Sequence, residues 1–543
     1  MNHIRIKVGN RLIAFILLVV LLPGWSQAAP KYGTNAIQEA ELRAHVEFLA
    51  SDELQGRGMP GMGSEITQRY IATRFAEYGL QAFPNLDGYF QTVPLHVSKT
   101  DYDNSSISFV KGDSAFILSA NNDFFFFPRG GSDMEVIGQL LFCGYGISAP
   151  EFGWDDFSDT DVEGKIVLAF NGEPTDNQGK PILNNGKRSR YANYLVKSRI
   201  VQEAGALCLI LVQPPSPDVP PVEKTLGRYL RRMDEVLVQL IDEREWFPVI
   251  YIKRNILSSL LGDSFDEGEY HHDLNDSSTN APAVMEGPVV GIDLRFKEEE
   301  LCETSNVIGY WQGKSDETVV VMAHYDHEGI KNGELYPGAD DNASGTAGLL
   351  GIARAFSAWG KKPQRGVVFL SSGAEEKGSL GAKHFLKNLP LALEKIVAVI
   401  NMDMIGRDGS SQFRAMMDPT IPMEEDLLMA FYSGQTPELA QIALEENKKA
   451  KLNLVLEPVL NFHSGSDHVY FHQLNIPSIF LFTGFHSDYT SPQDTPDKIL
   501  YGKLTRVVKL AFGMAYSLAQ SKEAPTFDSS IKEVQRTGRR YGF

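Results

Sequence analysis

Four short, β-branched apolar runs constrain the fold of this 543-residue chain more than any other feature. They cover residues Thr318–Ala323, Gly366–Leu370, Ile396–Ile400 and Ser478–Phe482. The runs are apolar at successive rather than alternate positions, so we expect strands that are buried on both faces. A helical stretch over 343–358, closed by Gly360, separates the first two runs. Strands that alternate with helices predict an α/β fold with a mostly parallel, mixed sheet covered by helices on both faces.

The rest of the chain differs in character from this α/β region. Residues 29–110 carry two amphipathic helical patterns, and we expect them to form the N-terminal helical part of the same domain. Residues 111–290 consist of short β-type runs and polar turns, which predicts an inserted, largely β domain ahead of the α/β region at 291–522. A polar tail follows over 523–543.

The first 28 residues have the order of a secretory signal peptide. A basic opening precedes the apolar run Leu12–Leu22, and small residues follow up to Ala28. The run is too short to span a bilayer, which takes about 20 residues. We therefore expect cleavage after 1–28, no stable membrane anchor in the mature protein, and a periplasmic or secreted location. The alternative is an uncleaved membrane anchor.

The charge balance narrows the choice of partners. The chain has 69 acidic and 51 basic residues, which gives a formal net charge of −18. A surface with this balance repels phosphate backbones, so we expect no nucleic-acid partner.

Carboxylates and imidazoles follow each of the four predicted strands. In chain order they are His324 and Asp326; Asp340 and Asp341; Glu375 and Glu376; Asp403; and His486, Asp488 and Asp494. Ligands in open α/β sheets bind at the carboxyl ends of the strands, and so many carboxylates at one edge repel one another unless a cation is present. Nitrogen and oxygen ligands without a thiolate favour catalytic zinc. The pattern predicts metal-assisted hydrolysis.

Two of these residues suggest supporting roles, and each residue also has an ordinary interpretation. Asp326 could accept the second imidazole N–H of His324, and a glutamate beside a ligating glutamate could act as general base on metal-bound water. Alternatively, Asp340 or Asp341 could cap the following helix. We interpret His327 as a packing or surface histidine. The joint placement at four strand ends favours the metal site.

These motifs resemble the M28 family of zinc aminopeptidases. The matching strings are His324-Tyr-Asp326, Gly-Ala-Asp-Asp341-Asn-Ala-Ser-Gly, Glu375-Glu376 and Asn-Met-Asp403-Met-Ile-Gly. The resemblance covers 300–520 and extends to 35–100, and the middle block resembles a protease-associated domain. It implies a zinc-exopeptidase fold with this domain inserted, and peptides as substrates.

The resemblance also implies a set of roles. One zinc ion would be held by His324, Asp341 and Asp403. A second would share Asp341 and would be held by Glu376 and a late histidine. Glu375 would be the general base, with Asp326 in support at the catalytic site.

The chain departs from the family pattern at the late histidine, because Thr490 occupies the position where the ligand is expected. A neutral hydroxyl is a poor zinc ligand. Three outcomes are open: His486 substitutes as a ligand, a water held by Thr490 fills the gap, or the second metal is absent.

These observations favour an extracytoplasmic zinc-dependent exopeptidase, most readily an aminopeptidase. The alternative is a single-metal or catalytically impaired protein with the peptidase fold that binds peptides without turnover. A carboxypeptidase is a further variant. A glutaminyl cyclase is disfavoured, because its single metal would need Asp341, Glu376 and the missing histidine.

Overall fold

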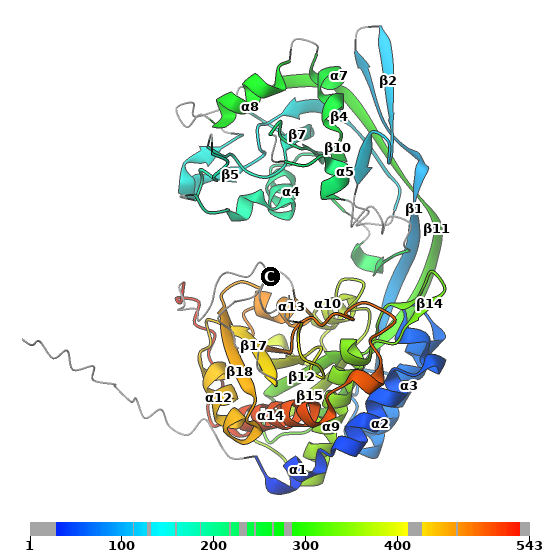
Figure 1. The fold of residues 1–543 in the computed structure, drawn as a ribbon, viewed down its shortest axis with the longest axis vertical. Coiled ribbons are helices and arrows are strands. Elements are labelled where there is room, and N and C mark those ends of the chain that lie inside the picture. The colour runs from blue at the N-terminus through cyan, green and yellow to red at the C-terminus, as the bar shows by residue number, and fades with distance from the viewer. Residues whose placement is uncertain are drawn as a thin grey trace, which may run out of the picture. The chain divides into compact units, whose positions relative to one another are not determined.

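The structure is a computed structural model that describes residues 29–532 with internal gaps (Figure 1). The gaps are 112, 127–131, 158–159, 177, 185, 217–218, 227–235, 244–245, 263–264, 276–284, 411–425 and 463–464. The predicted signal peptide and the last eleven residues of the predicted tail, 533–543, therefore lie outside the described residues.

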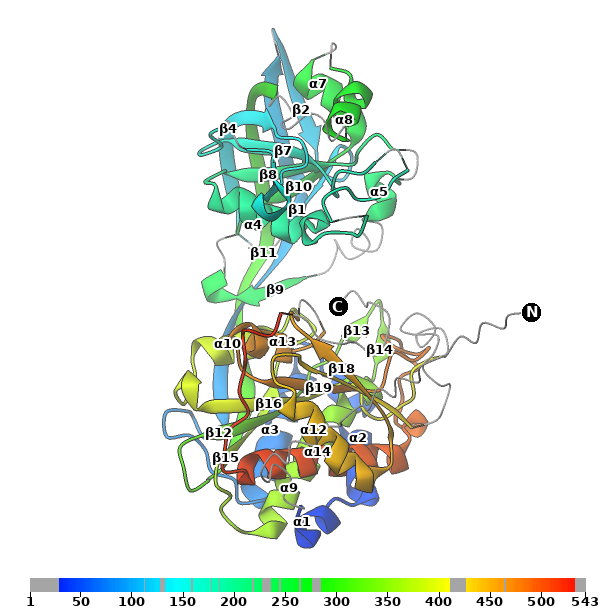
Figure 2. The same ribbon diagram turned by 90° about the vertical axis from the view of Figure 1, so that its left-hand side faces the viewer.

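Unit 1 contains a mixed β-sheet, seen from two sides in Figure 1 and Figure 2. Its strands lie in the order β18 (Asn453–Val459), β17 (Leu427–Ser433), β19 (Ser478–Phe482), β16 (Ile396–Met402), β12 (Thr318–His324), β15 (Gly366–Ser372) and β11 (Met285–Trp311). The four predicted strands are β12, β15, β16 and β19, and every residue in them is buried. Burial on both faces explains why these runs are apolar throughout.

The central strands of unit 1 run in the same direction. β12 pairs in parallel with β15 and with β16, and β16 pairs in parallel with β19. β15 pairs with β11 in an antiparallel direction, and β17 pairs with β19 in the same way. The predicted mostly parallel, mixed sheet is therefore confirmed. The carboxyl ends of β12, β15 and β16 lie at one edge, with His324 directly opposite Ser372.

Two long helices pack against this sheet and against each other. They are α9 (Gly345–Trp359) and α14 (Tyr501–Gln520), and both contact β12. The predicted helix at 343–358 is α9. It ends where Gly360 adopts a left-handed φ of 69°, a conformation that glycine accepts at little steric cost.

The N-terminal helical segment shares the core of unit 1. Its main helices are α2 (Glu39–Leu49) and α3 (Met62–Glu77), joined through a short 3₁₀ segment, Asp52–Arg57. α2 contacts α9 and α14 through the buried face that carries Leu42 and Val46. The segment therefore packs on the same two helices that cover the sheet.

Unit 2 has its own central sheet. The parallel strands β4 (Met134–Phe142), β7 (Ile166–Phe170), β8 (Cys208–Val212) and β10 (Val249–Ile252) are flanked by the antiparallel strands β11 and β3 (Phe124–Phe126). The residues of β7, β8 and β10 are all buried. The helix predicted within this region is α4 (Tyr194–Glu203).

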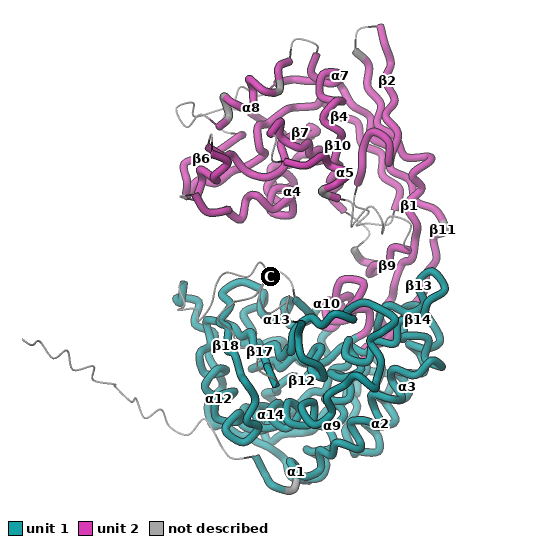
Figure 3. The backbone as a smooth tube through the Cα atoms, viewed as in Figure 1, with its two compact units in different colours: residues 1–90, 307–372, 386–543 teal, residues 91–306, 373–385 magenta. Residues whose placement is uncertain are grey.

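Contacts between Cα atoms define the two units (Figure 3). Unit 1 comprises residues 1–90, 307–372 and 386–543, and unit 2 comprises residues 91–306 and 373–385. The long strands β1 (Phe90–Lys111) and β11 carry residues of both units, and β1 also pairs with β2 (Ser114–Ser119) and β9 (Leu237–Leu240). The predicted boundaries after residues 110 and 290, and a protease-associated insertion, stay predictions.

The remaining described helices and strands complete the list. They are α1 (Lys31–Ala36), β5 (Ser148–Ala149), β6 (Trp154–Asp155), α5 (Val222–Thr225), α7 (Leu257–Leu261), α8 (Glu267–Asn275), β13 (Gly329–Lys331), β14 (Glu334–Tyr336), α10 (Leu380–Lys387), α12 (Glu438–Ala450) and α13 (His468–Gln473). Among the described residues, no helix has both the length and the apolar character needed to cross a bilayer.

His45 gives unit 1 a pH-dependent stability. Its side chain on α2 is buried, and its Nδ1 lies 2.7 Å from the hydroxyl of Tyr70 on α3. Burial, with a smaller contribution from the charge of Arg74, lowers the pKa of His45 from 6.5 to about 4. Between these two pH values the unfolded chain binds the proton and the folded chain does not, so the free energy of unfolding falls as the pH decreases.

We expect this group to reduce the free energy of unfolding by about 2 kcal/mol between pH 7 and pH 5. Urea denaturation of the unaltered chain and of His45→Gln at both pH values checks this. The variant should lose less stability on acidification than the unaltered chain. An equal loss in both proteins would contradict the assignment.

Candidate metal centre

The predicted ligands of the first ion meet at the carboxyl edge of the unit 1 sheet. His324 is the last residue of β12, and Asp403 follows directly after β16. Asp341 lies in a π-helical turn, Ala339–Ser344, where its φ and ψ of −103° and 97° depart from helical values. All three side chains are buried, and their ligand atoms lie within 4.8 Å of one another.

The separations within this group fit a tetrahedral ion. The Nε2 atom of His324 is 3.6 Å from Oδ1 of Asp341 and 3.4 Å from Oδ1 of Asp403. Ligand atoms that each stand about 2.1 Å from one tetrahedral zinc ion are roughly 3.4 Å apart. Imidazole nitrogen and carboxylate oxygen are both ligands that zinc takes in proteins. These residues therefore fit the metal that the sequence predicts.

The orientation of His324 is set by its other ring nitrogen. Nδ1 lies 3.2 Å from the backbone carbonyl oxygen of Asp326 and 3.8 Å from its carboxylate Oδ1. An N–H at Nδ1 that donates to this carbonyl leaves the lone pair of Nε2 facing Asp341 and Asp403. Asp326 lies where the prediction put it, fully buried beside His324, but the nearer acceptor is its main chain.

A second group forms around the other oxygen of Asp341. Nδ1 of His327 is 3.6 Å from Oδ2 of Asp341. Each carboxylate oxygen of Asp341 thus faces a different histidine. The interpretation of His327 as a packing or surface residue missed this placement. The available signal was its position three residues after His324, in the loop that follows β12.

His486 lies on a different pair of carboxylates. Its Nε2 is 3.5 Å from Oδ2 of Asp340 and 3.7 Å from Oδ1 of Asp494, and its Nδ1 accepts from the backbone N–H of Asp488. Burial lowers the pKa of His486 to about 4. The structure therefore does not bring His486 to the group around Asp341. Thr490 is half-buried, with a left-handed φ of 51°.

Asp340 and Asp494 hold the turn that carries Asp341. One oxygen of Asp494, Oδ2, accepts the backbone N–H groups of Asp340 and Asp341 at 2.9 and 3.1 Å. Oδ1 of Asp340 accepts from the backbone N–H of Gly406 at 2.7 Å. Burial, together with the charge of Asp494, raises the pKa of Asp340 to about 7. In this pair of adjacent aspartates, Asp340 is structural and Asp341 faces the histidines.

The side chain of Asn342 binds the first backbone N–H of α9 and the end of β16. Its side-chain Oδ1 accepts from the backbone N–H of Gly345, the first residue of the helix, at 2.9 Å, and its Nδ2 donates to the carbonyl of Met402 at 3.0 Å. The first N–H of α9 is therefore bound by Asn342 rather than by Asp340 or Asp341. The carboxylate of Asp341 faces His324 and His327.

Glu375 and Glu376 are half-buried on the loop after β15. The backbone N–H groups of Gly378 and Ser379 both donate to the carbonyl of Glu375 at 2.8 Å. The hydroxyl of Ser379 also donates to Oε1 of Glu375 at 3.5 Å. These bonds fix the turn and leave the Glu375 carboxylate on a loop at the carboxyl end of a central strand, where bound ligands are expected.

A buried arginine from the N-terminal segment forms hydrogen bonds with the segment after His324 and with the segment before Asp341. Arg57 is fully buried and donates to the carbonyl oxygens of Tyr325 at 2.7 Å, Pro337 at 2.7 Å and Gly338 at 2.8 Å, and also to that of Leu49. Tyr325 lies between His324 and Asp326, and Gly338 immediately precedes the turn with Asp341. Arg57 therefore connects the backbone at both histidines with the backbone at the shared carboxylate.

Residues 306–515 match the model of peptidase family M28. This region of the chain is therefore similar to peptidase family M28. Among curated relatives, the leupeptin-inactivating enzyme 1 of Streptomyces exfoliatus is 33% identical over 34% of this chain and 36% of its own length. Aminopeptidase YwaD of Bacillus subtilis (strain 168) is 25% identical over 41% of this chain and 46% of its own length. The chain thus spans less than half the length of these relatives.

One solved structure is similar to almost the whole of this chain. The aminopeptidase from Aneurinibacillus sp. strain AM-1 has a TM-score of 0.52 and 18% identity, and the match covers 94% of this chain and 99% of that one. At this identity the likeness concerns the fold, which confirms the α/β architecture expected from the sequence.

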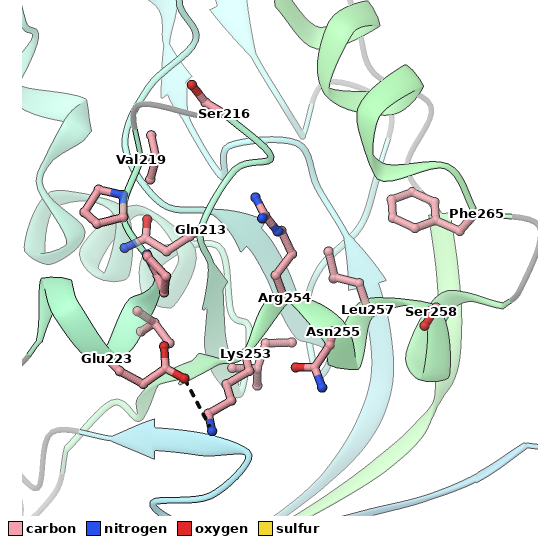
Figure 4. Close-up of a pocket in the computed structure, with 14 residues that line it drawn as sticks. Gln213, Ser216, Val219, Glu223, Lys253, Arg254, Asn255, Leu257, Ser258 and Phe265 are labelled. Atoms are coloured by element: carbon pink, nitrogen blue, oxygen red, sulfur yellow. Dashed lines mark ion pairs between the residues drawn. The ribbon is translucent and has the colours of Figure 1, made fainter.

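Unit 2 contains a cavity of about 720 Å³ (Figure 4). The residues that line it are not among the candidate metal ligands. It lies beyond the carboxyl ends of β8 and β10, where Gln213 and Lys253 follow directly after the strands. Lys253 forms an ion pair of 3.3 Å with Glu223, and Arg254 donates to the carbonyl of Pro214. The cationic groups at this cavity therefore already have partners within the unit.

We expect Arg57→Met to destabilise the folded chain by roughly 3 kcal/mol or more, since it leaves several buried carbonyl groups without a donor at about 1 kcal/mol or more each. Urea denaturation at neutral pH measures the change. Arg43→Met is the matched control, because the side chain of Arg43 on α2 is 45% exposed. Equal effects of the two substitutions would contradict the role of Arg57.

Proposed function

We propose that the chain is a zinc-dependent aminopeptidase that hydrolyses peptides outside the cytoplasm. The observation that carries the proposal is the carboxylate of Asp341, whose two oxygens each face a histidine at 3.6 Å. Asp403 stands beside the first histidine, and the surrounding sequence is that of family M28. A buried group of imidazoles and carboxylates with these separations is suited to a divalent ion.

Different residues would bind the metal, orient its histidine ligand and transfer the proton. Bound zinc would polarise the scissile carbonyl and lower the pKa of water, which is what this ion supplies in peptidases. His324, Asp341 and Asp403 would hold it, and the Asp326 carbonyl would keep the His324 ring in the required tautomer. Glu375 would take the proton from the attacking water and pass it to the leaving amine.

The choice of an aminopeptidase over a carboxypeptidase rests on the relatives. The Bacillus subtilis relative is named an aminopeptidase. Hydrolysis of peptides with a free amino terminus, and none of the same peptides after N-terminal acetylation, would support this direction. Hydrolysis that continues after N-terminal acetylation and stops after amidation of the carboxyl terminus would favour the carboxypeptidase.

The location and the identity of unit 2 are part of the same proposal. The basic, apolar and small residues at 1–28 support export and cleavage, and hence a periplasmic or secreted peptidase without a membrane anchor. The largely β composition of the insertion supports a protease-associated domain. Mass spectrometry of the protein recovered from its native host would give the mature N-terminus, expected at Ala29.

We expect Glu375→Gln to lower kcat by about 10²–10⁴-fold, since the amide cannot accept the proton from water. Chelation should abolish hydrolysis of short unblocked peptides, and added zinc should restore it. Release of the N-terminal amino acid is the measurement.

Glu394→Gln is the control for the loss of one negative charge. Glu394 is exposed on the short 3₁₀ turn that precedes β16, at the opposite end of that strand from Asp403. This variant should retain full activity. Peptide binding without turnover in the zinc-loaded, unaltered chain would refute the peptidase and favour the binding-protein alternative.

A further inference from the structure

The loop that should supply the last ligand of the second ion carries Thr490, yet a buried imidazole already lies against the shared carboxylate from another direction. We infer that His327, through Nδ1, is the histidine ligand of the second zinc ion in this chain. The assignment rests on the proposed zinc-dependent function. It moves the second histidine from the loop after β19 to the loop after β12.

The geometry around Asp341 is the first support. His324 and His327 approach different oxygens of the same carboxylate at the same distance of 3.6 Å. A carboxylate has two oxygens and could contact two ions, and an imidazole nitrogen beside each oxygen is a suitable zinc ligand. The two histidines lie on opposite oxygens of Asp341, so each is placed to contact a different ion.

The second support is that the ring of His327 is built into its place. A Cβ at Gly338 would lie 2.5 Å from Cγ and Cδ2 of His327, so this imidazole packs directly on a glycine with a φ of +60°. The backbone N–H of His327 donates to the carbonyl of Arg57 at 3.4 Å, while the Arg57 side chain holds the carbonyl of Gly338. The side chain of His327 is fully buried. Such packing holds a ligand in position before the metal binds.

The competing candidate is held elsewhere. His486 faces Asp340 and Asp494, and Asp494 in turn holds the backbone of Asp341. Moving His486 to the second ion would break contacts that position the shared carboxylate. The hydroxyl of Thr490 is a much weaker zinc ligand than an imidazole.

The zinc content of the full-length protein tests the assignment independently of activity. The protein is loaded with excess zinc, unbound ion is removed, and the zinc content per chain is measured by elemental mass spectrometry. We expect two zinc ions per chain in the unaltered protein and one in His327→Ala. Thr490→His should still hold two, because the site is already complete. His472→Ala is the matched control: it removes a buried histidine that contacts Ser433 and the carbonyl of Leu460, and it should keep both ions.

Two results would overturn the inference: retention of both ions by His327→Ala, or a single ion in the unaltered chain that Thr490→His raises to two. Two bound ions without peptide hydrolysis would refute the proposed function and leave the ligand assignment standing. If His327→Ala fails to fold, zinc-edge anomalous diffraction from the unaltered protein decides. A second peak beside Nδ1 of His327 supports the assignment, and one beside Thr490 or His486 overturns it.

Discussion

The site depends on where the carboxylate of Asp341 is held. Its oxygens face His324 and His327, its backbone N–H donates to Asp494, and the carbonyl of Gly338 just before its turn accepts from Arg57. These contacts come from the loop after β12, the loop after β19 and the N-terminal 3₁₀ segment. These contacts matter electrostatically, because burying a charged carboxylate costs free energy unless a positive charge lies nearby. A carboxylate between two imidazoles is therefore a suitable place for a cation.

The parts of this arrangement that could be predicted from the sequence are those fixed by local pattern. Strands that are buried on both faces appear in the sequence as continuous apolar runs. In a parallel sheet, the residues at their carboxyl ends lie at one edge. That reasoning placed His324 and Asp403 together. The contacts of Asp341 with Asp494 and with Arg57 join residues 153 and 284 positions apart, and no periodicity in the chain encodes such pairings.

The family pattern does not predict which histidine lies beside Asp341 in this chain. The resemblance directs attention to position 490, and proximity in the sequence directs it to His486. The structure places His486 against Asp340 and Asp494 and puts His327 beside Asp341. The difference is one of backbone path: the glycine at 338 allows the His327 ring to lie against the turn, and that close approach depends on the folded loop rather than on composition.

Asp341→Asn bears on both proposed zinc ions at once, because the carboxylate of Asp341 lies between His324 and His327. This substitution keeps the shape of the side chain and removes its charge. Zinc titration of the full-length protein by calorimetry should show two binding events in the unaltered chain and the loss of high-affinity binding at both sites in the variant. Retention of either site at its original affinity would contradict the account.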